Sequence, residues 1–377
     1  MKLAVPRERR AGEHRVAVVP EVAGRCSAAG ITVALEAGAG TAAHFPDGAY
    51  ADKGAVVGEL SDVLDGADMV ARVQAPTVEE VRSMPEEVSV VGLLQPASQL
   101  EVVEALVSRK DSAFSLDLLP RISRAQSMDA LSSQATVSGY LATLAAAERL
   151  PKFFPMFMTA AGTVPPAKVL VLGAGVAGLQ AIATARRLGA QVRANDVRAA
   201  AKEEVQSLGA TFVEVALETQ EGSGGYAREQ SEEYLARQRE LIGNEVAAAD
   251  VVITTAAVPG RKAPLLVTTA MVEAMAEGSV IVDLAADGGG NCELTRTGEE
   301  VVHNGVVVYG MSNPPSGMPT HASFLYARNV FNFLSLLVVD GELKPDFDDE
   351  IVAGTCVVRH GEVVHRPTAD LLAGATS

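Results

Sequence analysis

The sequence predicts an α/β protein made of two doubly wound, Rossmann-like domains that are separated by a cleft and joined by long helices. Strand-like apolar runs alternate with helical patterns in both halves of the chain, which is typical of parallel sheets with right-handed crossovers. The length of 377 residues also exceeds the size at which one hydrophobic core usually stops growing, about 250 to 300 residues. Two domains are therefore expected.

The first half of the chain alternates between short apolar runs and helical patterns. The expected strands are 3–5, 33–36, 69–73, 88–94 and 113–116. Pro20 opens the first expected helix, because proline is tolerated in the first helical turn. A long helical pattern then covers 128–150 without a strand, so we expect it to connect the two domains.

A second alternation begins at Val169. The segment before it, 151–166, is rich in Pro, Phe and Met and is expected to be irregular. The expected strands are 169–172, 191–194, 211–215, 251–254, 280–284 and 306–309. The glycine-rich stretch 217–227 has the composition of a mobile lid.

The apolar run 324–339 predicts another long helix, which would return the chain to the first domain. The first domain is then discontinuous, with residues 1–132 plus 322–377, and the second domain covers 133–321. The crevice between the two is the expected site.

Composition and charge exclude several classes of partner. A net charge of −16 argues against nucleic acid, because phosphate binding needs a basic face, and against direct membrane adsorption. The longest stretch of low charge, 169–185, is broken by glycines and is too short for a membrane span. Cys26, Cys292 and Cys356 are too far apart for a CxxC site, so no metal is expected. The first residues lack the apolar core of a signal peptide, which predicts a cytoplasmic protein.

A glycine motif follows the strand expected at 168–172. The hexapeptide is GAGVAG, 173–178, and a helical pattern comes directly after it. Gly173 permits the tight turn, Gly175 lets the backbone approach a pyrophosphate, and Gly178 allows close packing of helix on strand. Glycines alone could serve packing only. Strand, motif and helix together predict a dinucleotide site with the helix N-terminus facing the phosphates.

An acidic residue ends the next expected strand. Asp196 lies 18 positions beyond Gly178 (196 − 178). A carboxylate at this place accepts hydrogen bonds from the adenosine ribose and repels a 2′-phosphate, which favours NAD over NADP. Arg198 has two interpretations: it offers charge to a 2′-phosphate, or it is a solvated surface residue.

Several segments resemble one family. They are PRERR at 6–10, RISRAQSMD at 121–129 followed by LSSQ at 131–134, MTAAGTVPPA at 158–167, and GGNC at 289–292. In these segments, which span nearly the whole chain, the sequence closely resembles the NAD(H)-binding subunit of proton-translocating nicotinamide nucleotide transhydrogenase.

The resemblance implies roles for individual residues. Arg121, Asp129 and Ser132 would hold the nicotinamide carboxamide and orient the ring. Gln126 would face NADP(H) on a partner subunit, and Tyr226 would belong to the lid. Without the resemblance, Arg121 and Asp129 could be a surface ion pair and Ser132 ordinary helix filler. The full implied cofactor-binding set is Arg121, Ser132, Gly173, Gly175, Val176, Gly178, Asp196, Val197, Arg198, Gly225, Tyr226, Ala256 and Ala257.

The resemblance also implies a reaction and an assembly. The reaction would be that of a Si–Re-specific NAD(P) transhydrogenase, with hydride passing directly between NADH bound here and NADP⁺ on the partner, coupled to proton translocation. The subunit would be a homodimer. It would dock on membrane-embedded and NADP(H)-binding subunits at the inner face of the plasma membrane, without inserting into the membrane itself.

Alanine dehydrogenases have the same fold and provide a contrast. They resemble this chain at EHRVA, 13–17, where Arg15 would bind a substrate carboxylate, and at Asp287. Where they require a Lys and a His, this chain has Gln74 and Gln95. Amine oxidation needs a group that titrates near pH 7, whereas hydride transfer between nicotinamides needs only orientation and exclusion of water.

Two alternatives stay open at this point. The first is a self-contained amino-acid dehydrogenase that uses Arg15, which turnover of an amino acid by the isolated chain would establish. The second is a non-catalytic NAD-sensing module, which would bind NADH and never donate hydride with any partner.

Overall fold

The structure is a computed structural model that describes residues 1–198, 200–214, 232–257 and 262–375. The chain divides into unit 1, Met1–Gln134 with Pro315–Ser377, and unit 2, Ala135–Pro314. The chain thus passes from unit 1 to unit 2 after residue 134 and back after residue 314, whereas the sequence predicted these two boundaries after residues 132 and 321. Each unit has its own mainly parallel sheet, so the predicted α/β fold with two Rossmann-like sheets is confirmed. The expected lid, 217–227, lies outside the described residues.

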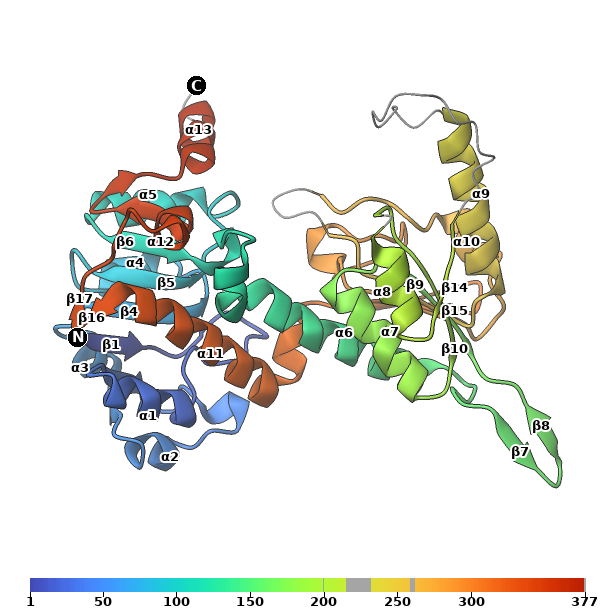
Figure 1. The fold of residues 1–377 in the computed structure, drawn as a ribbon, viewed down its shortest axis with the longest axis horizontal. Helices are drawn as coiled ribbons and strands as arrows, with labels where there is room; N and C mark the ends of the chain where they lie inside the picture. Colours follow the sequence, from blue (N-terminus) through green and yellow to red (C-terminus); the bar gives the residue numbers. More distant parts are fainter. Residues whose placement is uncertain (199, 215–231, 258–261, 376–377) are drawn as a thin grey trace. The chain divides into compact units, whose positions relative to one another are not determined.

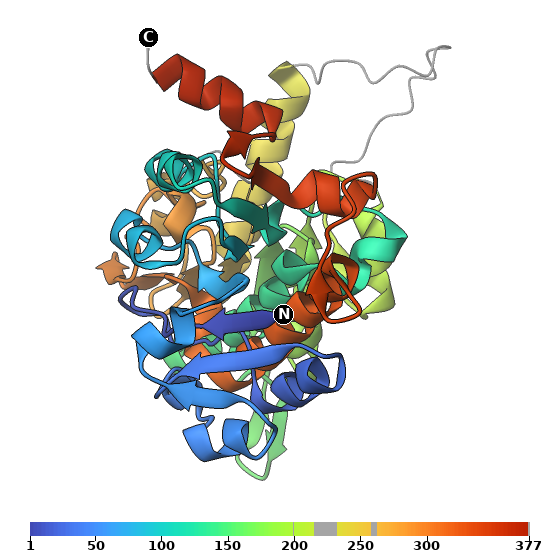
Figure 2. The same cartoon turned by 90° about the vertical axis from the view of Figure 1, so that its left-hand side faces the viewer.

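Unit 1 is built on an eight-stranded sheet with the order β19-β18-β6-β5-β4-β1-β2-β3. Its strands are β1 Lys2–Val5, β2 Thr32–Glu36, β3 Val56–Gly58, β4 Met69–Gln74, β5 Ser89–Leu93, β6 Ser112–Ser115, β18 Cys356–Arg359 and β19 Glu362–Val363. Neighbours from β3 to β6 run parallel, while β18 is antiparallel to β6 and β19. Figure 2 looks onto this unit, where the N-terminus marks β1 inside the sheet.

The strands of unit 1 bury both faces. Leu3 and Val5 belong to one core cluster, while Ala4 between them belongs to another, because successive side chains point to opposite sides of a strand. The first cluster also contains side chains of α1 and α11, and the second contains side chains of α3, α4 and α5. The helices of unit 1 are α1 Pro20–Ala28, α2 Asp47–Ala51, α3 Leu60–Leu64, α4 Val78–Ser83, α5 Leu100–Ser108, α11 Pro319–Leu337, α12 Glu350–Thr355 and α13 Arg366–Ala375.

Two long helices were expected, and both are present. The pattern 128–150 is α6, Ala130–Arg149, which begins in unit 1 and continues into unit 2. The run 324–339 is α11, which begins earlier because Pro319 occupies its first turn. It ends where the chain enters the short strand β16, Val338–Val339, which pairs with β17, Glu342–Leu343.

Unit 2 has a seven-stranded sheet with the order β11-β10-β9-β12-β13-β15-β14. Its strands are β9 Lys168–Leu172, β10 Gln191–Asn195, β11 Thr211–Phe212, β12 Val251–Thr254, β13 Val280–Asp283, β14 Glu300–His303 and β15 Val306–Gly310. Its other helices are α7 Val176–Arg187, α8 Ala201–Ser207, α9 Glu232–Ala248 and α10 Thr269–Glu273. The chain leaves β9 toward β10 on one side and returns to β12 on the other. The strand order therefore reverses at β9, and ligands of open α/β sheets bind at such a switch point.

Segment 151–166 differs from the prediction. It contains an antiparallel hairpin of β7, Phe157–Thr159, and β8, Gly162–Val164, which projects from unit 2 in Figure 1. All residues of both strands are exposed. The prediction of an irregular segment was wrong because the prolines lie on either side of the hairpin rather than inside it. Its turn also places Gly162 at a positive φ of 131°, which glycine tolerates.

Among the described residues, no helix is both long enough and apolar enough to cross a membrane. The three cysteines are free thiols buried in the cores, and burial raises the pKa of Cys26 to about 12 and the pKa of Cys292 and Cys356 to about 11.

Candidate dinucleotide site

The GAGVAG segment forms the turn from β9 into α7. Gly173 has a φ of 100°, and a Cβ at this position would lie 2.6 Å from Thr255 Oγ1. A Cβ on Gly178 would lie 1.9 Å from the Gly173 carbonyl oxygen, so the helix can pack this closely only with glycine there. Gly175 is different, since apart from its own chain neighbours no atom lies within 4 Å of its Cβ position. The first and third glycines serve the turn, and the second leaves open space beside the backbone.

The N-terminus of α7 begins at this turn. Gly175 is its N-cap residue and provides no side-chain cap, and the first turn has no acidic residue. The first N–H groups of a helix have no partner inside it and carry partial positive charge, which suits an anion. Helix α6 packs closely on the same turn, because a Cβ on Gly139 would lie 2.0 Å from the Ala177 carbonyl oxygen. Helix α6 therefore packs against one side of this segment, while the space beside Gly175 is open.

Asp196 follows β10 and is tied to the glycine turn. Its Oδ2 accepts the Ala174 N–H at 2.7 Å, and its Oδ1 accepts the Arg198 N–H at 2.8 Å. Arg198 also donates through Nε to Oδ1 at 3.0 Å and through Nη2 to Oδ2 at 3.2 Å. Burial would raise the pKa of Asp196, but these bonds hold it below its usual value. Arg198 is therefore a hydrogen-bonded partner of Asp196, and its side chain is also solvated, with 56% of it exposed.

The loop after β12 lies beside the turn. Thr255 Oγ1 donates to the Gly173 carbonyl at 3.0 Å, which joins this loop to the glycine motif. Ala256 donates its N–H to Asn291 Oδ1 at 3.0 Å, and Asn291 Nδ2 returns a bond to the Ala256 carbonyl at 2.8 Å. Residues 258–261, which follow the predicted contact Ala257, lie outside the described part of the chain.

Asn291 is held in turn by Asp283 at the end of β13. Both residues are fully buried, and Asp283 Oδ2 accepts the Asn291 N–H at 2.7 Å. Thr295 Oγ1 donates to the same oxygen at 2.7 Å. Asn291, Asp283 and Thr255 had no predicted role in the site. The GGNC motif at 289–292 was the available signal for Asn291.

In unit 1, the RISRAQSMD segment forms the 3₁₀ helix Ser123–Met128, which two contacts fix. Arg124 makes a bidentate ion pair with Asp349, in which Nη1 donates to Oδ2 at 2.6 Å and Nη2 donates to Oδ1 at 2.9 Å. The Ser127 carbonyl accepts bonds from Asn329 and Asn332 of α11, each at 2.9 Å. Gln126 lies between these two anchors, and its side chain is exposed, as is that of Arg121.

Asp129 and Ser132 are brought together at the start of α6. Asp129 accepts the Ser132 N–H at 2.9 Å through Oδ1 and the Ser132 hydroxyl at 2.6 Å through Oδ2. This is the bonding of an N-terminal helix cap. The pair lies in unit 1, whereas the glycine motif, Asp196 and Ala256 lie in unit 2. Gly225 and Tyr226 lie outside the described residues.

Arg15 and Gln74 also meet in unit 1, through Glu13. Arg15 donates to both carboxylate oxygens of Glu13, at 2.8 and 2.6 Å, and to Gln134 Oε1 at 2.8 Å. Gln74 Nε2 donates to Glu13 Oε2 at 2.9 Å. Burial would raise the pKa of Glu13, but the bonds from Arg15 and Gln74 lower it to about 2. A small pocket of about 220 Å³ opens beside this network.

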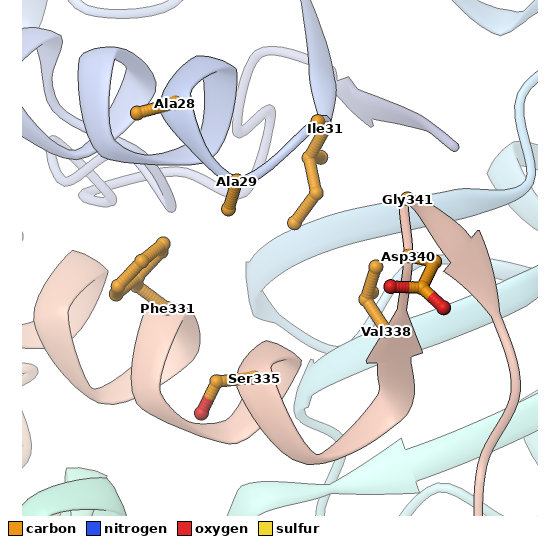
Figure 3. Close-up of a pocket in the computed structure, with 9 residues that line it drawn as sticks. Ala28, Ala29, Ile31, Phe331, Ser335, Val338, Asp340 and Gly341 are labelled. Atoms are coloured by element: carbon orange, nitrogen blue, oxygen red, sulfur yellow. The ribbon is translucent and has the colours of Figure 1, made fainter.

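A larger groove in unit 1 has a different character (Figure 3). Its volume is about 580 Å³, and its nine lining residues come from the end of α1, from α11 and from the β16–β17 turn. Asp340 is the one charged residue among those nine, and no residue of the predicted site lines the groove. In the described part of the chain, no cluster of His, Cys, Asp and Glu could hold a metal ion.

Comparison with known proteins gives matches along nearly the whole chain. Residues 4–138 match the N-terminal domain of alanine dehydrogenase/PNT, and residues 142–366 match its C-terminal domain. The sequence is 48% identical to the first segment of the divided NAD(P) transhydrogenase subunit alpha of Rhodospirillum rubrum, over 97% of this chain and 98% of that protein.

Two solved structures are similar to this one. The structure of a transhydrogenase from Sinorhizobium meliloti matches with a TM-score of 0.89 and 42% identity, over 96% of this chain and all of that one. An L-alanine dehydrogenase structure matches with a TM-score of 0.84 and 27% identity, over 99% of each chain.

Proposed function

Because the chain belongs to the alanine dehydrogenase/PNT family, and within it to the NAD(P) transhydrogenase alpha subunits, we propose that it is the NAD(H)-binding component of a proton-translocating transhydrogenase. In this proposal NAD(H) binds unit 2 and NADP(H) binds a partner subunit. Hydride passes directly between them with Si–Re specificity, coupled to proton translocation by membrane-embedded subunits.

The observation that carries NAD(H) binding is the glycine turn at the switch point of the unit 2 sheet. The open backbone at Gly175 and the first N–H groups of α7 suit a pyrophosphate. Asp196, bonded to the same turn, suits the adenosine ribose. Val176, Val197, Ala256 and Ala257 border these groups along the chain, and we assign them to the same nucleotide.

Bound NADH supplies a hydride from C4 of its ring, and the residues of this chain orient that ring and exclude water. We assign orientation to Arg121, Asp129 and Ser132, and the contact with the partner's NADP(H) to Gln126. The anchored 3₁₀ helix supports this role for Gln126, because a side chain on a fixed backbone can be aligned for transfer.

The self-contained amino-acid dehydrogenase is disfavoured by the residues around Arg15. Gln74 and Gln95 stand where the dehydrogenases have their titratable pair, and neither can exchange a proton. Transfer between two nicotinamides has no proton to manage, so it tolerates this arrangement.

We also propose that the protein is a homodimer at the inner face of the plasma membrane, held there by its partner subunits. The exposed hairpin supports an interface between copies. Met158 is 77% exposed, and Phe157 and Val164 are also exposed, whereas soluble monomers rarely leave clustered apolar side chains in water.

The test combines the chain with its partner. We expect the isolated chain to bind NADH without oxidising it in the presence of pyruvate and ammonia. After the NADP(H)-binding subunit and NADP⁺ are added, NADH deuterated at the transferred C4 position should give deuterated NADPH. Loss of deuterium to solvent, or pyruvate turnover by the isolated chain, would contradict the proposal.

A further inference from the structure

Asp196 and Arg198 form one closed unit at the end of β10. Each carboxylate oxygen of Asp196 accepts two hydrogen bonds, and three of the four come from Arg198. Arg198 Nη2 also donates to the Ala174 carbonyl at 3.0 Å, so the guanidinium spans the acid and the glycine turn. The turn, the acid and the arginine are thus joined in a ring of bonds.

The two side chains differ in exposure. The Asp196 side chain is 8% exposed, whereas the Arg198 side chain is 56% exposed. The arginine therefore lies on the solvent side of the acid. In NAD sites of this kind an acid at this position bonds the ribose hydroxyls, whereas in NADP sites an arginine nearby accommodates the 2′-phosphate. Here both groups are present, two residues apart, and each neutralises the other.

We propose that Arg198 has two roles. It positions the Asp196 carboxylate, and it is a potential binding group for a 2′-phosphate that its ion pair with Asp196 keeps from binding one. The preference for NADH over NADPH then belongs to the pair and not to Asp196 alone. The inference rests on the proposed binding of NAD(H) by unit 2. In this proposal an arginine beside the ribose site is compatible with a preference for NADH.

The charge balance gives the direction of the effect. With both side chains present, the pair has no net charge, and a 2′-phosphate would meet the Asp196 carboxylate. If Asp196 is replaced by serine, Arg198 keeps its charge and loses the carboxylate that it bonds, while the charge of Glu204, which also acts on Arg198, remains. A planar guanidinium binds a phosphate through two parallel bonds, so the same arginine would then attract NADPH.

The experiment is a double-mutant cycle on the full chain with Asp196→Ser, Arg198→Ala and the double variant. Nucleotide fluorescence titrations give the Kd of NADH and of NADPH for each. We expect Asp196→Ser to weaken the binding of NADH about tenfold and to strengthen the binding of NADPH about tenfold. The double variant should lose this gain in NADPH affinity. Arg198→Ala alone should weaken NADH several-fold, because Asp196 loses its clamp, with little effect on NADPH.

Arg193→Ala is the matched control. Arg193 lies on β10 and pairs with Glu245 at 2.6 Å, so its loss removes a similar exposed ion pair and should leave both Kd values unchanged. Equal NADPH affinity in Asp196→Ser and in the double variant would overturn the inference, as would parallel losses for both nucleotides on removing Arg198. Failure of the unaltered chain to bind NADH would instead reject the proposed function.

Discussion

Asn291 and Ala256 are joined by a pair of hydrogen bonds between one side-chain amide and one residue's backbone, at 3.0 and 2.8 Å. The same amide also donates to the Pro264 carbonyl at 2.8 Å. Asn291 thus fixes both ends of the loop that contains the predicted contacts Ala256 and Ala257. A residue with no expected ligand contact therefore holds the backbone of the predicted contact Ala256 in place.

Replacing Asn291 with Ala should therefore weaken NADH binding by about tenfold and lower stability by about 1 to 3 kcal/mol, because three backbone groups lose their partner. Isothermal titration and thermal unfolding would measure the two effects. Asn304→Gly is the control, since Asn304 bonds a carbonyl in the same unit at an exposed site and has a positive φ. An Asn291→Ala variant with unaltered NADH affinity would contradict this role.

The glycines of the motif should respond differently to the same substitution. Gly178→Ala should destabilise unit 2 by about 4 kcal/mol or more, because its Cβ would overlap the Gly173 carbonyl oxygen at 1.9 Å. Gly175→Ala should change stability by no more than about 1 kcal/mol, since its Cβ enters open space. It should nevertheless abolish most NADH binding. Unfolding and titration of both variants would distinguish packing from ligand approach, and full binding by Gly175→Ala would remove it from the pyrophosphate site.

Gln126→Ala should separate binding from transfer. The side chain is exposed on an anchored 3₁₀ helix, so we expect unchanged folding and unchanged NADH affinity. Transfer to NADP⁺ on the partner subunit should slow about 10- to 100-fold, because alignment at the point of transfer is lost. Arg121→Ala is the comparison and should impair both steps. Equal defects in NADH binding for the two variants would count against the role of Gln126.

Asp111 should give unit 1 a stability that depends on pH. Burial raises its pKa to about 6 despite the opposing charge of Arg109. A carboxyl group whose pKa is raised by folding binds its proton more tightly in the native state, so stability falls as pH rises from about 4 through 6. Asp111→Asn should remove this slope and raise the Tm above pH 6, while keeping an acceptor for the Val88 N–H. Melting curves from pH 4.5 to 7.5 would check the sign, and a wild-type Tm that rises with pH relative to the variant would refute it.

The sequence was sufficient to predict the fold class and the position of the glycine turn. Continuous apolar runs identify buried parallel strands, a period of 3.6 residues identifies the helices between them, and GAGVAG stands between such a strand and such a helix. The position of Asp196 was predicted from its distance along the chain from the motif, because neighbouring parallel strands end at the same edge of the sheet. These predictions depend on local chemistry that each segment carries by itself.

The contacts of Arg198 with Ala174, of Asn291 with Ala256 and of Glu13 with Gln74 could not be predicted in the same way. Each depends on which residues from distant segments meet at the carboxyl ends of the strands, and spacing along the chain does not encode this. The β7–β8 hairpin was missed for another reason. Its strands are short and exposed on both faces, so they lack the alternation of apolar and polar residues that identifies a half-buried strand.

Because the three thiols are buried, their chemical labelling can be used to follow the unfolding of each unit. Cys26 and Cys356 belong to a core of unit 1, and Cys292 belongs to a core of unit 2. Because only an exposed thiolate reacts rapidly, an alkylating reagent can modify each cysteine only when its own core opens. Peptide mass spectrometry of a labelling time course would thus read out two separate opening rates from one unaltered chain.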